Sequence, residues 1–196
     1  MTEKVLYFLR HGQAQSNAQH FFAGQADVPL TALGEAQAKA TAPLLAQLKF
    51  DKVYCSDLQR AKCTAALALP SYECEYTAEI REISVGELAF KYFPQCAEEY
   101  GERYWNARRT GDYSAFGGES RDQLKARADA FLHKVAALED TPTVCAVCHG
   151  GFIRAAARVV LGDVNTLAMP DNCAVAKFSY TDGIWTLDKW NVTVTF

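Results

Sequence analysis

Apolar and polar positions alternate in blocks along the chain, and these blocks predict strands separated by helices. Residues 5–9, 52–55 and 143–148 are short, mainly apolar runs, as in strands covered on both faces. Residues 72–76 alternate and predict a further short strand. Residues 173–190 predict a hairpin that turns at Thr181-Asp182-Gly183. The polar stretch 12–30 predicts a loop.

Helical signals fill the intervals between these strands. Thr31 is a predicted N-cap, and Pro43 inside the following helix predicts a kink or restart near residues 39–43. Asp57 is expected to begin a second helix, which ends before Pro70.

Two later helices have clearer boundaries. Ser120 and Gln123 form a capping box ahead of an amphipathic stripe. The stripe consists of Leu124, Ala128, Phe131, Val135 and Leu138. The last helix follows Gly150 and is closed by Gly162. Strands alternating with helices indicate an α/β protein, a three-layer α/β/α sandwich with a mainly parallel sheet.

Length and composition narrow the organisation. The 196 residues predict a single domain, residues 1–196. Within it, residues 95–109 are expected to be helical. The surrounding segment 79–118 is rich in glycine, proline and aromatic residues and is expected to cap the site.

Charge and cysteine content exclude several classes of protein. A net charge of −3 argues against a nucleic-acid surface, and no apolar run approaches the roughly 18 residues of a membrane span. The N-terminus has too few apolar residues for a secretory signal. Seven cysteines, an odd number, indicate reduced thiols, so we expect a cytoplasmic protein. Nothing in the sequence indicates an oligomeric state.

Basic and imidazole side chains follow the predicted strands. Arg10 and His11 come after the first strand, Arg60 after the second, and His149 and Gly150 after the strand at 143–148. Carboxyl ends of parallel strands meet at one edge of a sheet, so these residues should converge. Guanidinium groups bind phosphate oxygens, a neutral imidazole can attack phosphorus, and a helix N-terminus attracts anions. The pattern predicts a phosphoryl-binding pocket.

A competing motif overlaps this pocket. Cys145, Cys148 and His149 match C-x-x-C-H, the haem c attachment pattern. Residues three apart in a strand point to opposite faces, so the two sulfurs should diverge. We therefore expect no haem, no disulfide and no metal site there, and no cofactor.

Several segments together resemble the histidine phosphatase superfamily, which has the phosphoglycerate-mutase-like fold. The first is LRHGQAQSN at 9–17. The others, in chain order, are Pro29-Leu30-Thr31 with Gly34 and Gln37, Ser56-Asp57-Leu58-Gln59-Arg60-Ala61, Arg81-Glu82-Ile83 with Gly86-Glu87, Gly117-Gly118-Glu119-Ser120 and His149-Gly150-Gly151. The resemblance covers nearly the whole chain.

The resemblance implies roles for individual residues. His11 would become phosphohistidine, and Arg10, Arg60 and His149 would hold the phosphoryl oxygens without a metal. Glu82 would protonate the leaving oxygen, with Glu87 as the alternative acid. The remaining implied substrate-binding residues are Asn17, Gly24, Gln25 and Gly150.

Some features favour one branch of this family. The stretch 22–30 resembles broad-specificity and alpha-ribazole phosphatases, and the mutases are usually longer. Cys55 and Cys148 stand where the family often has serine or threonine, and Leu88-Ala89-Phe90 replaces a usual Trp-Glu-Gly. The implied function is hydrolysis of a small phosphomonoester. The alternatives are a phosphoglycerate-type mutase and an inactive phosphate-binding module.

Overall fold

The computed structural model describes residues 3–162, 164 and 166–194. Six strands form one sheet in the order β3-β2-β4-β1-β5-β6. The strands are β1 (Lys4–Arg10), β2 (Lys52–Ser56), β3 (Glu75–Thr77), β4 (Thr143–Cys148), β5 (Val175–Thr181) and β6 (Ile184–Val192). Strands β3, β2, β4 and β1 are parallel, β5 is antiparallel to β1, and β6 is antiparallel to β5. The prediction of a mainly parallel sheet is confirmed.

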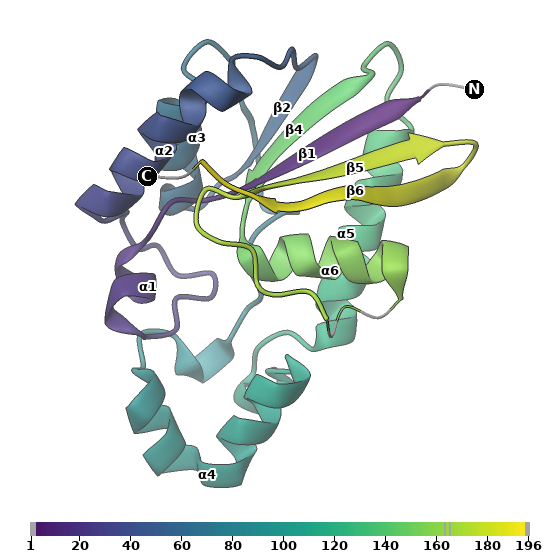
Figure 1. Cartoon of the computed structure of the whole chain (residues 1–196). Coiled ribbons are helices and arrows are strands. Elements are labelled where there is room, and N and C mark those ends of the chain that lie inside the picture. Colours follow the sequence, from purple (N-terminus) through teal and green to yellow (C-terminus); the bar gives the residue numbers. More distant parts are fainter. Residues whose placement is uncertain (1–2, 163, 165, 195–196) are drawn as a thin grey trace.

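Helices cover both faces of this sheet (Figure 1). The helices are α1 (Gln15–Gln19), α2 (Ala32–Leu45), α3 (Gln59–Ala68), α4 (Phe93–Thr110), α5 (Arg121–Ala136) and α6 (Gly150–Leu161). Two short 3-10 helices, η1 (Gly86–Leu88) and η2 (Ser114–Phe116), flank α4 in the chain. Helices α2 and α3 pack on one face, and α5 and α6 pack on the other. The chain thus forms three layers, with α4 projecting beyond one end of them.

Each face of the sheet packs against its helices in a cluster of buried apolar side chains, and strand β4 supplies residues to both clusters. Cys148 packs in the cluster with α5 and α6, whereas Cys145 packs in the cluster with α2 and α3. The two thiols therefore lie on opposite sides of the sheet, as the strand periodicity predicts. Burial raises the pKa of both thiols, so each is a neutral core group.

The N-terminal caps of two helices are the ones that the sequence predicts. The Ser120 hydroxyl accepts a hydrogen bond from Gln123 N at 3.1 Å, and the Gln123 side chain accepts one from Ser120 N at 2.8 Å. The Thr31 hydroxyl accepts from Gly34 N at 3.1 Å. These caps begin α5 and α2 at the predicted places.

Several boundaries differ from those expected. Helix α2 continues through Pro43, which lies in its last turn, so the missing donor removes a bond only where the helix is about to end. The polar stretch 12–30 contains the short α1. Helix α3 begins at Gln59, because the Asp57 carboxylate pairs with Arg81 at 2.6 Å rather than capping the helix.

Helix α4 consists of two arms that meet at Gly101. Gly101 has φ 51° and ψ −128°, a conformation outside the helical region that favours glycine. Figure 1 shows the two arms forming a V at the far end of the molecule. Among the described residues, no helix is long and apolar enough to cross a membrane.

Candidate active site

A cavity of about 210 Å³ lies at the carboxyl ends of the parallel strands. Its wall includes Arg10 at the end of β1 and His11 directly after it. Arg60 comes from the first turn of α3, and Glu82 from the segment between β3 and η1. Residues far apart in the chain therefore meet at the sheet edge, where the strand order predicts them.

His11 is buried, with 4% of its surface exposed. Its Nδ1 lies 2.7 Å from the carbonyl oxygen of Gly12, which can only accept, so Nδ1 carries the proton. Nε2 is then the nitrogen with the lone pair, and Arg60 Nε lies 3.3 Å from it. Burial, together with Arg60 and Arg10, holds the pKa of His11 well below its ordinary value. His11 is thus a neutral imidazole whose basic nitrogen is Nε2.

The two arginines are fixed before any ligand binds. Arg60 donates from Nη1 to Ala26 O at 2.9 Å and from Nη2 to Gly24 O at 2.7 Å. Desolvation by burial lowers the pKa of Arg60 to about 10. Arg10 donates to Pro170 O, and its buried Nε has no hydrogen-bond partner within the described chain. One buried and one half-buried guanidinium group beside an imidazole favour an anionic ligand.

His149 lies behind His11, with ring centroids 5.0 Å apart. It is fully buried, and the described residues of the cavity wall do not include it. Its Nε2 lies 2.8 Å from Ser56 Oγ, while Nδ1 has no partner among the described residues. Burial, then Arg60, His11 and Arg10, keep the pKa of His149 well below its ordinary value. His149 therefore adds a neutral polar group to the site.

Of the two acids that the resemblance implies, the cavity wall contains Glu82. The Glu82 carboxylate accepts from Ile83 N at 2.8 Å and from Gly151 N at 3.0 Å. The start of α6 therefore holds Glu82, rather than presenting this amide to a ligand as the sequence suggested. The alternative acid, Glu87, is paired with Arg103, and the nearby Glu79 and Glu119 are paired with Lys134 and Arg127.

The backbone at Glu82 is held by a small polar network. Arg127 donates to the carbonyls of Arg81 at 2.6 Å and Glu82 at 3.2 Å. Glu119 accepts from Ser84 N at 2.8 Å and pairs with Arg127. These contacts fix the segment that carries the carboxylate.

Of the other predicted site residues, two line the cavity and two lie outside its described wall. Gln25 donates to Glu82 O at 3.1 Å and lies outside the described cavity wall. Asn17 and Gly24 line the cavity. Gly150 is buried at the start of α6, where a Cβ would come within 2.8 Å of Met169 Sδ. Gln25 and Gly150 therefore lie beside the cavity, outside its described wall.

Several wall residues were not identified from the sequence. They are Ser16, Phe21, Phe22, Arg108 and Met169. Of the aromatic residues in 79–118, Phe93 and Tyr113 line the cavity, while Tyr104 and Phe116 pack in the core of that segment. The density of rings was the available signal for this wall, and no sequence pattern marks Met169.

Gly151 leaves no room for a side chain. A Cβ built there would lie 2.1 Å from Glu82 Oε1. We expect Gly151→Ala to displace the carboxylate and to slow any reaction in which Glu82 takes part by about 10²-fold, the usual effect of an ångström-scale misplacement. Steady-state rates and the thermal unfolding midpoint, measured on one preparation, separate this loss from misfolding. Unchanged rates would contradict the assigned position of Glu82.

Comparisons with known proteins agree with this geometry. "Probable phosphoglycerate mutase GpmB" of Salmonella paratyphi A is 30% identical over 193 residues, covering 95% of this chain and 90% of that protein. A mycobacterial glucosyl-3-phosphoglycerate phosphatase, solved with VO3, superposes with a TM-score of 0.88 at 28% identity and covers 97% of this chain and 100% of its own. A putative alpha-ribazole-5'-P phosphatase from Escherichia coli has the same fold, with a TM-score of 0.85 at 24% identity, over 96% of each chain.

A family description matches almost the entire chain. Residues 6–193 match the histidine phosphatase superfamily, branch 1. This range contains all the residues that converge at the cavity. This match agrees with the sheet order and with the histidines and arginines that converge at the cavity. The chain therefore belongs to branch 1 of the histidine phosphatase superfamily.

Proposed function

We propose that this protein hydrolyses small phosphomonoesters through a phosphohistidine intermediate on His11. The observation that carries the proposal is the state of His11: a buried, neutral imidazole with Nδ1 bonded to Gly12 O and Nε2 as its basic nitrogen. Such a nitrogen is a competent nucleophile near neutral pH.

The first step transfers the phosphoryl group to the enzyme. His11 Nε2 attacks phosphorus, the bond between phosphorus and the leaving oxygen breaks, and Glu82 donates a proton to that oxygen. Arg10, Arg60 and His149 stabilise the charge on the phosphoryl oxygens. Asn17, which lines the same cavity, contacts the phosphoryl group.

The second step returns the enzyme to its starting state. A water molecule attacks the phosphorus of phosphohistidine while Glu82 accepts its proton. The bond between His11 Nε2 and phosphorus breaks, and inorganic phosphate leaves. Glu82 serves as acid and then as base, so one carboxylate suffices for both steps. Segment 79–118 forms the cap that faces the leaving group, since Ile83, Phe93 and Arg108 lie in the cavity wall.

The second candidate is a phosphoglycerate-type mutase, favoured by the relative named a probable phosphoglycerate mutase. Phosphorus NMR of a reaction with 3-phosphoglycerate separates the two. Hydrolysis gives inorganic phosphate and glycerate, and it needs no primer. A mutase gives 2-phosphoglycerate in a reaction that depends on a bisphosphate. A phosphomonoester panel that releases no phosphate would overturn the proposal of a hydrolase.

Catalysis should not require a metal ion. Arg10 and Arg60 supply positive charge at the phosphoryl position, so we expect EDTA to leave the hydrolysis rate unchanged. Activity measured before and after chelation, with added magnesium or zinc as the comparison, checks this. Loss in EDTA with recovery on adding a metal would indicate metal-assisted chemistry instead.

A further inference from the structure

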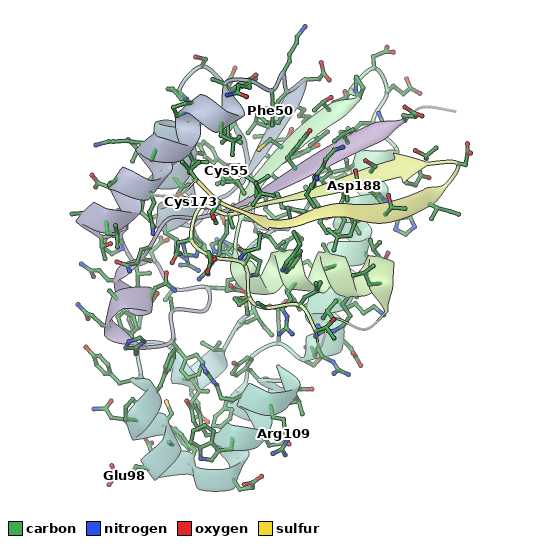
Figure 2. The ribbon with its side chains drawn as sticks, viewed as in Figure 1. Phe50, Cys55, Glu98, Arg109, Cys173 and Asp188 are labelled. Carbon is green, nitrogen blue, oxygen red and sulfur yellow. The ribbon has the colours of Figure 1, made fainter. Side chains whose placement is uncertain are left out.

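A loop between α6 and β5, residues 170–173, contacts the residues at the end of β1. The carbonyl oxygen of His11 accepts two hydrogen bonds from this loop, from Asn172 Nδ2 at 3.1 Å and from Cys173 N at 3.3 Å. The carbonyl oxygen of Pro170 accepts a hydrogen bond from Arg10. Figure 2 labels Cys173, which lies just before β5. The 170–173 loop therefore contacts the backbone of His11 and the side chain of Arg10 together.

The 170–173 loop is itself fixed to the sheet. Asp171 N donates to Asn191 Oδ1 at 2.6 Å, and Asn191 Nδ2 donates to Asp171 Oδ2 at 2.9 Å, near the end of β6. Cys173 has φ 58°, a left-handed conformation that is costly for a residue with a side chain, and its side chain is buried in the core. Because Asp171 and Cys173 are both anchored, Asn172 between them is held in one position.

The orientation of the Asn172 amide follows from its neighbours. A backbone carbonyl oxygen can only accept, so the group that faces His11 O is the NH₂ group, which has two N–H donors. The same nitrogen lies 3.4 Å from Asn17 Oδ1, which accepts its second hydrogen bond. One amide nitrogen thus joins the backbone of His11 to the side chain of Asn17.

The Asn17 amide is oriented by the same reasoning. Ala14 N can only donate, and it lies 3.0 Å from Asn17 Oδ1, so this oxygen accepts from both Ala14 and Asn172. Asn17 Nδ2 has no acceptor among the described residues, and Asn17 lines the catalytic cavity. The N–H donors of Asn17 are therefore available to a phosphoryl oxygen in that cavity.

Asn17 lies on an element that has little stability of its own. Helix α1 has five residues and buries one of them, Ser16. The hydrogen bond from Asn172 connects this helix to the anchored loop and to His11. It thereby limits where the Asn17 amide can lie relative to His11. Asn172 is half-buried and lies outside the described wall of the cavity, so it acts through Asn17.

We propose that Asn172 is a positioning residue of the phosphoryl site, which holds the Asn17 amide with its N–H donors toward the phosphoryl group. The inference rests on the proposed function, since it concerns the same site. When Asn172 is replaced, the His11 carbonyl keeps its hydrogen bond from Cys173 N. Loss of Asn172 should therefore weaken phosphate binding and leave the nucleophile in place.

A double-mutant cycle with inorganic phosphate tests this without turnover. Calorimetry would compare the unaltered protein, Asn17→Ala, Asn172→Leu and the double variant, because leucine keeps the branched shape of asparagine and removes both donors. Asn17→Ala should weaken binding by about 10- to 100-fold, as loss of a hydrogen bond to a charged group does. Asn172→Leu should weaken binding by about 10-fold alone, and by less than about 2-fold when residue 17 is already alanine.

Further measurements separate positioning from a loss of packing. In Asn172→Leu, the acid limb of kcat/KM should stay where it is in the unaltered protein, because His11 keeps its neighbours. Asn172→Ala removes the same donors without adding apolar bulk and should show the same coupling to Asn17. The thermal unfolding midpoint identifies a variant that does not fold. Asn106→Ala is the matched control, because Asn106 is exposed on α4 and bonds to Arg109, and it should bind phosphate normally.

Several results would overturn the inference. They are losses that multiply in the double variant, normal phosphate binding by Asn172→Leu, failure of both Asn172 variants to fold, and absence of phosphate binding by the unaltered protein. The proposed function fails separately. Coupled losses without hydrolysis of any phosphomonoester would retain the role of Asn172 and refute the hydrolase, whereas hydrolysis with independent losses would retain the hydrolase and refute this role.

Discussion

Replacing His11 with alanine should abolish phosphoryl transfer. Removing a covalent nucleophile costs about 10⁴-fold or more in rate. In the unaltered protein, a brief incubation with radiolabelled substrate should leave label that is labile in acid and stable in base, as phosphohistidine is. His11→Ala should acquire none.

The matched control is His133→Ala, because His133 is exposed on α5 and pairs with Asp129. It should label and turn over like the unaltered protein. Label that persists in His11→Ala would place the nucleophile elsewhere.

His11 also determines how kcat/KM falls at low pH. Because the pKa of His11 is held well below its ordinary value of 6.5, the imidazole stays unprotonated as pH falls through that value. It becomes protonated, and loses its nucleophilic lone pair, only at lower pH. The acid limb of kcat/KM should therefore lie below pH 6.5.

Replacing Glu82 with glutamine should produce a loss that depends on the leaving group. An alkoxide needs a proton as it departs, so hydrolysis of alkyl phosphates should slow by about 10²–10⁴-fold. A nitrophenolate leaves without one, so p-nitrophenyl phosphate should be affected far less. Steady-state kinetics on both substrate types gives the comparison.

Glu87→Gln is the control for this prediction. Glu87 pairs with Arg103 at 3.0 Å and lies outside the described wall of the catalytic cavity. The substitution should leave both rates near their original values. Equal slowing of both substrate types in Glu82→Gln would mean that Glu82 positions the phosphoryl group and is not the acid.

The sequence predicted the strands from their apolar runs and the site from the residues at the strand ends. Apolar runs predicted β1, β2 and β4, and the residues that follow them, His11 and Arg60 above all, meet because parallel strands end at one edge. The Ser120 capping box succeeded because its bonds are local. These features depend on neighbours within a few residues, or on a general rule of sheet geometry.

What escaped prediction depends on contacts between distant segments. The role of Gly151 appears only when α6 lies beside Glu82, and that of Gln25 only when its amide reaches the backbone of the same residue. Asp57 had the sequence of a helix start, yet its carboxylate pairs with Arg81. A second cavity, of about 330 Å³, likewise joins arginine side chains from α4, α5 and α6, which no pattern within one segment reveals.

The break in α4 bears on how specificity could change in this fold. A straight helix would separate Phe93 from Arg108 by about 22 Å at 1.5 Å per residue. The reversal at Gly101 instead brings them into contact, at 4.7 Å. A Cβ at the turn would meet no atom within 4 Å. Residues inserted at this tip would therefore lengthen both arms without disturbing the sheet that carries His11, and the leaving-group side could diversify while the phosphoryl chemistry stays constant.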